Sequence, residues 1–192
     1  SEGMALGRNG EKKWPEAIKA FQSCVALDAN HSKAWFELGY TYNQENGGNS
    51  CEAEYEPYTR CIALDPKNAA AHNNLANILW KVRKDYDGAE RYYRKVIELT
   101  PTASRYNNLG TLLNDVRKDY DGAERMYRKA IELEPKHTRA HWNLSTILEE
   151  RKNDIPGAVK LMEEYVRLGG TPGVIDGKQR LATLRRKLEG NP

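Results

Sequence analysis

Apolar residues recur every three or four positions along most of the chain, which is the spacing expected of amphipathic helices. The clearest stretch runs from Val82 to Pro101, and it recurs 34 residues later, from Val116 to Pro135, with three substitutions. Each copy contains an expected second helix, such as residues 86–99, and follows an expected first helix, such as residues 69–82. The pattern therefore predicts a repeated array of two-helix units.

Capping residues and small residues mark where these helices begin and how they pack. Asp85 and Asp119 stand where second helices should begin, because an aspartate side chain can accept a free backbone N–H there. Small residues fall in two columns, one on the first helices and one on the second, so that the two helices of a unit can approach closely. The columns are Ala76, Gly110 and Ser145, and Ala89, Ala123 and Ala158.

These columns resemble the tetratricopeptide repeat, whose first helix carries Trp, Leu, Gly and Tyr at fixed spacings. The matching residues are Trp35, Leu38, Gly39 and Tyr42, and Pro66 follows the second helix of the same unit. The resemblance implies an all-α fold. The implied fold is an α-solenoid, a right-handed superhelix of stacked helix-turn-helix units that ends in a C-terminal capping helix.

The repeat spacing predicts six segments. They are a partial unit at 1–31, a unit with a lengthened turn at 32–68, units at 69–102, 103–137 and 138–171, and a linker with the capping helix at 172–192. Because residues 1–9 supply only part of a first helix, we expect the array to be cut from a larger protein. Glu54 replaces a small residue of the pattern, and Tyr165 and Gly170 depart from it where stacking should end.

Composition narrows the function classes. Hydrophobic residues make up 39% and charged residues 30%, which fits a thin two-layer array better than one deep core. The 30 Lys and Arg against 27 Asp and Glu give no basic footprint of a nucleic-acid binder. The three cysteines and four histidines lack metal-ligand spacing, and no run of about 20 apolar residues predicts a membrane span. We expect no cofactor, no metal, no nucleic acid, no membrane insertion, and a reducing compartment, the cytoplasm.

The resemblance implies that the first helices line a concave face, so the candidate site consists of first-helix residues that avoid the packing columns. Asn74, Asn108 and Asn143 each precede the Leu column in three successive units. Asparagine is a mediocre helix former, and its amide can pair with one peptide group of a bound chain. The candidate peptide-binding residues are Asn73, Asn74, Asn77, Asn107, Asn108, Thr111, Arg139, Trp142 and Asn143.

The three asparagines resemble the asparagine ladder of superhelical repeat proteins. Such a ladder would hold an extended peptide segment without reading its sequence. The alternative is that these side chains bridge adjacent units or solvate the groove, and that Trp142 packs between units rather than anchoring a ligand.

Three functions compete. The first is a protein-interaction scaffold or adaptor that binds an extended segment of a partner. The second is a constitutive structural subunit of a large assembly, and the third is a non-catalytic, substrate-recruiting domain of a larger enzyme. The chain shows no nucleophile elbow, His-Glu-x-x-His motif or phosphate loop, so we expect it not to be an enzyme.

Overall fold

The computed structural model describes residues 13–170 and 176–190, and these residues form helices and turns without any strand. The chain divides into two compact units, Ser1–Thr100 (unit 1) and Pro101–Pro192 (unit 2). The predicted partial helix at residues 1–9 lies outside the described residues, as do residues 171–175, where we expect part of the linker.

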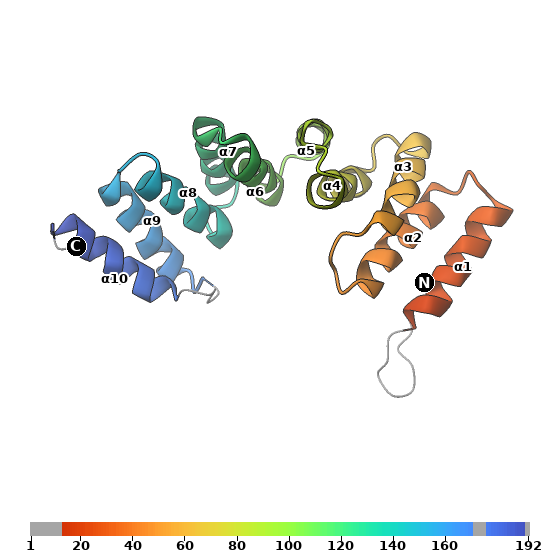
Figure 1. Ribbon diagram of the computed structural model, residues 1–192, viewed down its shortest axis with the longest axis horizontal. Coiled ribbons are helices and arrows are strands. Elements are labelled where there is room, and N and C mark those ends of the chain that lie inside the picture. Colours follow the sequence, from red (N-terminus) through yellow and green to blue (C-terminus); the bar gives the residue numbers. More distant parts are fainter. Residues whose placement is uncertain (1–12, 171–175, 191–192) are drawn as a thin grey trace. The chain divides into compact units, whose positions relative to one another are not determined.

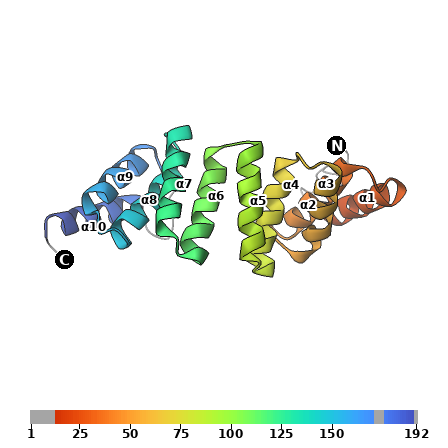
Figure 2. The same cartoon turned by 90° about the horizontal axis from the view of Figure 1, so that it is seen from above.

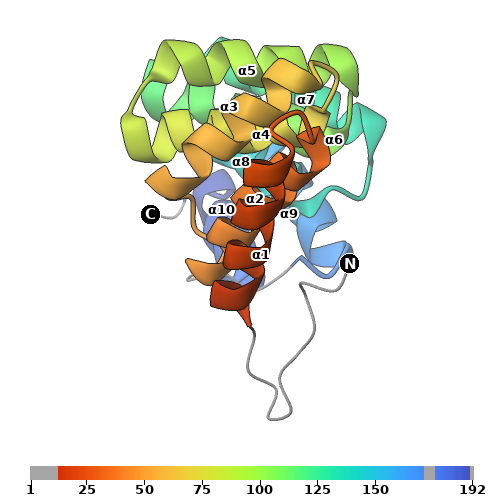
Figure 3. The same ribbon diagram turned by 90° about the vertical axis from the view of Figure 1, so that its right-hand side faces the viewer.

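Unit 1 is a succession of helices in which each packs against the next along the chain (Figure 1, Figure 3). The short connections between them make successive helices antiparallel neighbours, as the two-helix pattern predicts. Its helices are α1 Trp14–Leu27, α2 Ser32–Glu45, η2 Glu52–Glu54, α3 Tyr55–Leu64, α4 Ala69–Ile78, η3 Leu79–Arg83 and α5 Tyr86–Leu99.

Unit 2 is built in the same way, and Figure 2 shows α6 and α7 side by side. Its last helix, α10, packs against α9 and not against a further repeat among the described residues. Its helices are α6 Ala103–Leu112, η4 Leu113–Arg117, α7 Tyr120–Leu133, α8 Thr138–Glu150, α9 Ile155–Arg167 and α10 Gly177–Leu188.

Aspartate caps start the second helices, as predicted for Asp85 and Asp119. Their carboxylates accept the backbone N–H of Gly88 at 2.9 Å and of Gly122 at 2.8 Å. A β-carbon on Gly122 would lie 2.1 Å from the Asp119 carboxylate, so the glycine leaves room for the cap. The first helices use different caps, namely His31, Asn68 and His137.

The turn between the helices of a unit departs from a simple helix end. In α4 and α6 the last turn widens into a π-helical turn, η3 and η4. Lys84 and Lys118 then adopt the left-handed conformation, with φ of 58° and 55°. A lysine there costs about 1 kcal/mol, and the cap at the next residue, Asp85 or Asp119, offsets part of that cost.

Buried tyrosines explain the small-residue columns. Tyr58, Tyr93 and Tyr127 on the second helices are at most 1% exposed. A β-carbon on Gly39 would lie 2.9 Å from the Tyr58 ring, and one on Gly110 would lie 2.7 Å from the Tyr127 ring. The small first-helix residues therefore make room for an aromatic ring from the second helix, a detail that the column pattern alone does not specify.

The lengthened turn leads into a unit with an unusual core residue. Glu54 occupies the place of the small second-helix residue and is 1% exposed, whereas its neighbour Ala53 is exposed. Its carboxylate accepts hydrogen bonds from the Cys51 backbone at 2.7 Å and from the Asn43 amide at 3.2 Å. Burial raises the pKa of Glu54, and these two donors offset part of the cost of burying it.

The C-terminal helix closes the array as predicted. Tyr165 is buried. A β-carbon added to Gly170 or Gly177 would lie within 2.6 Å of the Tyr165 ring, so both glycines leave room for it. Leu181 and Leu184 of α10 are buried, whereas Leu188 is 49% exposed. The buried apolar stripe of α10 therefore ends at Leu184, one turn before Leu188.

Candidate functional site

The candidate residues lie on the first helices of three helix pairs, α4/α5, α6/α7 and α8/α9, and they differ in exposure. Most are half-buried; Asn107 is 6% exposed and Arg139 is exposed. They are Asn73, Asn74 and Asn77 on α4, Asn107, Asn108 and Thr111 on α6, and Arg139, Trp142 and Asn143 on α8. In each of units 1 and 2, the polar surface that these residues form is called the first-helix face below.

On α4, the amides take part in a chain of hydrogen bonds. The Asn74 amide donates to the Tyr58 hydroxyl of α3 at 2.9 Å, and the Asn73 amide donates to the Asn74 oxygen at 3.4 Å. Burial raises the pKa of Tyr58, so its hydroxyl stays protonated at neutral pH. Asn74 therefore satisfies a buried hydroxyl, which is a structural use of a predicted ladder residue.

Two further candidates accept hydrogen bonds from the core tyrosines of their own units. The Tyr93 hydroxyl donates to Asn77, and the Tyr127 hydroxyl donates to Thr111 at 3.3 Å. Burial raises the pKa of Tyr127 to about 12. Each tyrosine lies 16 residues after its acceptor, and this repeated spacing is the signal that sequence reasoning missed.

On α6 and α8, an asparagine pair links two first helices within unit 2. The Asn143 amide donates to the Asn107 side-chain oxygen at 3.0 Å. A bridge between adjacent helix pairs is the structural alternative considered for these asparagines, and Asn143 makes it. Asn107 is almost fully buried, so it acts as the support for Asn143 more than as a surface group.

The bridge leaves Asn143 with binding capacity. A side-chain amide offers two N–H donors and a carbonyl oxygen, and the bond to Asn107 uses one N–H. It also fixes the orientation of the amide, which lowers the entropy lost when a further partner binds. Asn143 is therefore held with one N–H and its oxygen available.

Trp142 is packed by the C-terminal part of unit 2. The Tyr165 ring lies 5.3 Å from it between centroids, and the Arg180 guanidinium lies 4.6 Å from its ring centroid. Arg180 is itself held by Glu149 at 2.9 Å. The capping helix thus covers part of the indole, which agrees with the packing alternative and leaves the half-buried edge for other contacts.

The residues of the predicted ladder belong to two different units. Asn74 belongs to unit 1, whereas Asn108 and Asn143 belong to unit 2. A single continuous ladder from Asn74 to Asn143 stays a prediction. Within the described residues no group of three or more His, Cys, Asp or Glu side chains could hold a metal ion, and no described helix is long and apolar enough to cross a membrane.

Models of the tetratricopeptide repeat match residues 58–91 and 115–171 of the chain. The chain is 35% identical over 88 residues to the peroxisomal targeting signal receptor of Candida albicans, and 36% identical over 87 residues to that of Komagataella phaffii. Each match covers 45% of this chain and 14% of the relative. The chain thus spans a small part of these receptors.

Solved structures share the fold. The crystal structure of MamA has a TM-score of 0.73 at 22% identity and covers 81% of this chain and 88% of its own. YrrB, described as a TPR protein with an unusual peptide-binding site, has a TM-score of 0.70 at 16% identity, with 91% and 84% covered. PilF of Pseudomonas aeruginosa has a TM-score of 0.72 at 17% identity, with 92% and 78% covered. These likenesses establish an α-solenoid of helix pairs.

Proposed function

Because the chain belongs to the tetratricopeptide repeat family, whose repeats form protein-interaction scaffolds, we propose that it holds an extended peptide segment of a partner protein on its first-helix face. The observation that carries the proposal is the oriented amide of Asn143. It is half-buried, is held by Asn107 at 3.0 Å, and keeps an N–H and an oxygen for a partner.

An amide in this state suits the backbone of an extended chain. A peptide group presents one N–H and one C=O, which match the two groups that Asn143 has left. Asn108 stands at the corresponding position of the preceding unit, one residue before the buried Leu109. With units ~10 Å apart and an extended chain rising ~3.3 Å per residue, the two amides would address peptide groups about three residues apart.

The relatives support a peptide ligand. Two of them are named as receptors for a peroxisomal targeting signal, and one structural neighbour is described as having an unusual peptide-binding site. We extend only the general chemistry to this chain, a peptide segment held on a repeat surface. The near balance of charge favours a protein partner over nucleic acid.

The cysteines favour the cytoplasm as the place of action. Cys24, Cys51 and Cys61 are free thiols, and Cys61 is fully buried. Burial raises the pKa of Cys61 to about 11, so this thiol is a poor nucleophile. Free thiols persist in a reducing compartment.

The proposal is tested with an array of nine-residue peptides of diverse sequence. Peptides retained by the full chain are then titrated in solution by fluorescence anisotropy against Asn108→Ala and the double variant Asn108→Ala/Asn143→Ala. A hydrogen bond of this kind contributes ~1 kcal/mol, about fivefold in Kd. We expect about fivefold weaker binding for the single variant and a larger loss for the double variant.

The matched control is Asn30→Ala, which makes the same change in the exposed α1–α2 turn. It should bind as the unchanged chain does. Circular dichroism separates lost binding from lost folding, which matters because Asn143→Ala also removes the donor to Asn107. Equal affinities of all four proteins, or no retained peptide, would contradict the proposal.

A further inference from the structure

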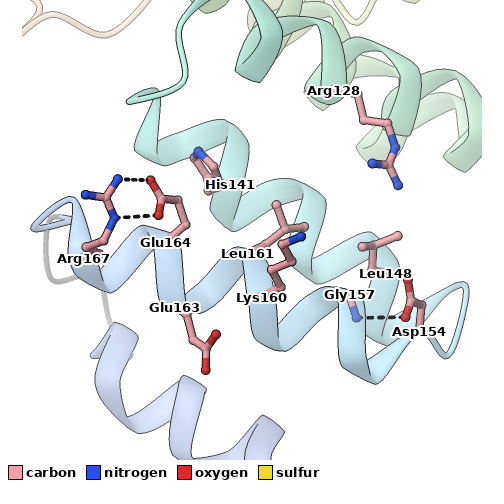
Figure 4. Close-up of a pocket in the computed structure, with 10 residues that line it drawn as sticks. All are labelled: Arg128, His141, Leu148, Asp154, Gly157, Lys160, Leu161, Glu163, Glu164 and Arg167. Atoms are coloured by element: carbon pink, nitrogen blue, oxygen red, sulfur yellow. Dashed lines mark hydrogen bonds and ion pairs between the residues drawn. The ribbon is translucent and has the colours of Figure 1, made fainter.

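A groove of about 610 Å³ lies in unit 2 between α7 and α9, over α8. Figure 4 shows His141 and Leu148 of α8 together with Leu161 of α9 along it. Charged side chains of α9 stand at its rim, including Lys160, Glu164 and Arg167. None of the candidate residues of the first-helix face lines this groove.

His141 lines the groove, and its ring contains a buried hydrogen-bond acceptor without a partner. The residue is 4% exposed, and its Nε2 lies 2.9 Å from the Pro135 carbonyl oxygen. Because a carbonyl can only accept, Nε2 must carry the proton, and the neutral ring then has a bare lone pair on Nδ1. Nδ1 is buried and has no partner. Such an atom carries a desolvation cost that a ligand donor would relieve.

Unit 1 contains the same arrangement with the place over the imidazole filled. His72 Nε2 lies 2.9 Å from the Pro66 carbonyl oxygen, and its Nδ1 is likewise buried without a partner. The Tyr92 ring of α5 lies over His72 with a centroid distance of 5.5 Å. Leu161 takes the position of Tyr92 in unit 2, since each stands three residues after a buried alanine, Ala89 or Ala158.

The surroundings of His72 indicate what kind of group could cover His141. An aromatic ring covers His72, yet the Tyr92 hydroxyl does not reach Nδ1, which stays unpaired. An indole carries its N–H on the ring itself, so it can provide both the flat apolar cover and the missing donor. We propose that the groove over His141 binds a tryptophan side chain of a partner peptide, whose indole N–H donates to His141 Nδ1.

The dimensions and rim of the groove suit a peptide. Its volume falls within the range of ~300–1,000 Å³ typical of ligand sites, which leaves space beside an indole for flanking residues. At the rim Arg167 grips Glu164 with two hydrogen bonds of 2.7 and 2.5 Å (Figure 4). This pair fixes one wall, and the exposed Lys160 on the same helix can reach a carbonyl of the bound segment.

In the part of the chain that the structure describes, the corresponding groove of unit 1, over Trp35, lacks the buried unpaired acceptor that His141 provides in unit 2. It has a volume of about 360 Å³ and is lined by Trp35, Leu38 and Tyr42 of α2. The Trp35 indole N–H already donates to the Ala29 carbonyl oxygen at 2.9 Å. Among the described residues that line this groove, no buried side-chain acceptor lacks a partner. We therefore assign the indole site to unit 2.

The test uses the full chain and two blocked tetrapeptide probes, N-acetyl-Ala-Trp-Ala-Ala-amide and its 1-methyltryptophan analogue, which keeps the ring but lacks the N–H. Binding is followed by NMR through the ¹⁵N shift of His141 Nδ1. We expect a saturable shift with the tryptophan probe and roughly fivefold weaker binding of the methylated probe. Equal affinity of the two probes, or no saturable change at His141, would overturn the proposal.

A substitution that fills the groove can be copied from unit 1 of the same chain. Leu161→Tyr copies the residue that covers His72 and should weaken the tryptophan probe at least tenfold, whereas Leu64→Tyr, the same change at an exposed position of unit 1, should leave it unchanged. If Leu161→Tyr binds normally while folded, the groove is not the site.

A second variant keeps the proposal testable should Leu161→Tyr misfold. His141→Phe removes the acceptor at a position where other units carry Trp35 and Tyr106, so the fold should tolerate the ring. It should abolish the preference for tryptophan over 1-methyltryptophan. A preference that persists in this variant would contradict the role of Nδ1. Because Asn108→Ala leaves the groove intact, failure of the first-helix proposal and failure of this one are distinguishable.

Discussion

The helix pairs α4/α5 and α6/α7 share almost the same second helix but have different first helices. Tyr93 and Tyr127 are both 1% exposed. The Tyr127 ring packs on the buried Gly110 of its own first helix, and the buried Ala76 stands at the corresponding position of the other pair. The packing position therefore tolerates only small changes, because the tyrosine ring fills the space beside it.

The hydroxyl ends of the same tyrosines show more freedom. Tyr93 donates to Asn77 and Tyr127 donates to Thr111, so either an amide or a hydroxyl can serve as the acceptor. A buried hydroxyl needs a partner, but any acceptor at the right place suffices. The difference between the pairs separates the residues that the fold requires, the ring and its small neighbour, from a polar face that can vary and is therefore available for binding.

Removing a buried tyrosine ring should lower the free energy of unfolding more than any other change considered for these two helix pairs. Tyr93→Ala and Tyr127→Ala should each lower the free energy of unfolding by about 3–5 kcal/mol, because each deletes a fully buried aromatic side chain and leaves a cavity. Urea unfolding followed by circular dichroism measures the loss, with Arg91→Ala on the exposed face of α5 as a neutral control. A loss below about 1 kcal/mol in either variant would show that the rings are not the shared requirement.

The first helices of the two pairs also begin differently. The Asn68 side chain accepts the Ala71 backbone N–H at 3.0 Å at the start of α4, whereas Thr102 at the start of α6 makes no side-chain cap hydrogen bond. Asn68→Ala should cost about 1 kcal/mol, and Thr102→Ala should stay within about 0.5 kcal/mol. The same urea unfolding experiment ranks them; equal losses would remove this difference between the pairs.

Removing only the hydroxyl groups of Tyr93 and Tyr127 should show how much each hydroxyl–acceptor bond contributes to stability. Tyr93→Phe should cost about 1 kcal/mol, since Asn77 loses its donor. Tyr127→Phe should cost less, because its bond to Thr111 is long at 3.3 Å and the Thr111 hydroxyl also donates to the Asn107 carbonyl at 2.9 Å. Thermal unfolding of both variants shows which one loses more stability. A larger loss for Tyr127→Phe would contradict the conclusion that the bond to Asn77 is the stronger of the two.

The smallest effect concerns pH at the next first helix, α8. His137 caps it by accepting the Ala140 N–H on Nδ1 at 3.2 Å, which requires a neutral ring. Burial lowers the pKa of His137 below its usual 6.5, so the unfolded chain takes up the proton first as pH falls. The stabilisation is complete above pH ~6.5 and is lost as pH falls through the lower folded pKa.

The expected loss at His137 is below about 1 kcal/mol. Comparing urea midpoints at several pH values between 7 and 5 for the unchanged chain and for His137→Asn isolates it, because an asparagine cap, like Asn68 on α4, does not titrate. A pH profile that is the same for both proteins would show that the cap does not sense protonation.

The pattern of apolar and small residues was sufficient to predict the helix pairs, the aspartate caps and the closing helix, because each follows from local spacing. It could not place Glu54 in the core, since hydrogen bonds from Cys51 and Asn43 across the lengthened turn make that burial possible. It selected polar positions that do lie on the first helices, and their role in binding stays a prediction. It could not tell which of them serve buried partners, because the Asn143–Asn107 and Asn74–Tyr58 bonds join helices whose relative rotation no local pattern specifies.

Binding of an extended peptide on the first-helix face can be followed directly through the side-chain amide signals of Asn108 and Asn143. A peptide retained by the array is titrated into ¹⁵N-labelled protein, and the NH₂ resonances of all asparagines are followed. If the peptide lies on this face, we expect saturable shifts at Asn108 and Asn143 with the same Kd, while the signal of the exposed Asn30 in the α1–α2 turn does not shift. Saturable binding that leaves the Asn108 and Asn143 amides unshifted would contradict binding on this face.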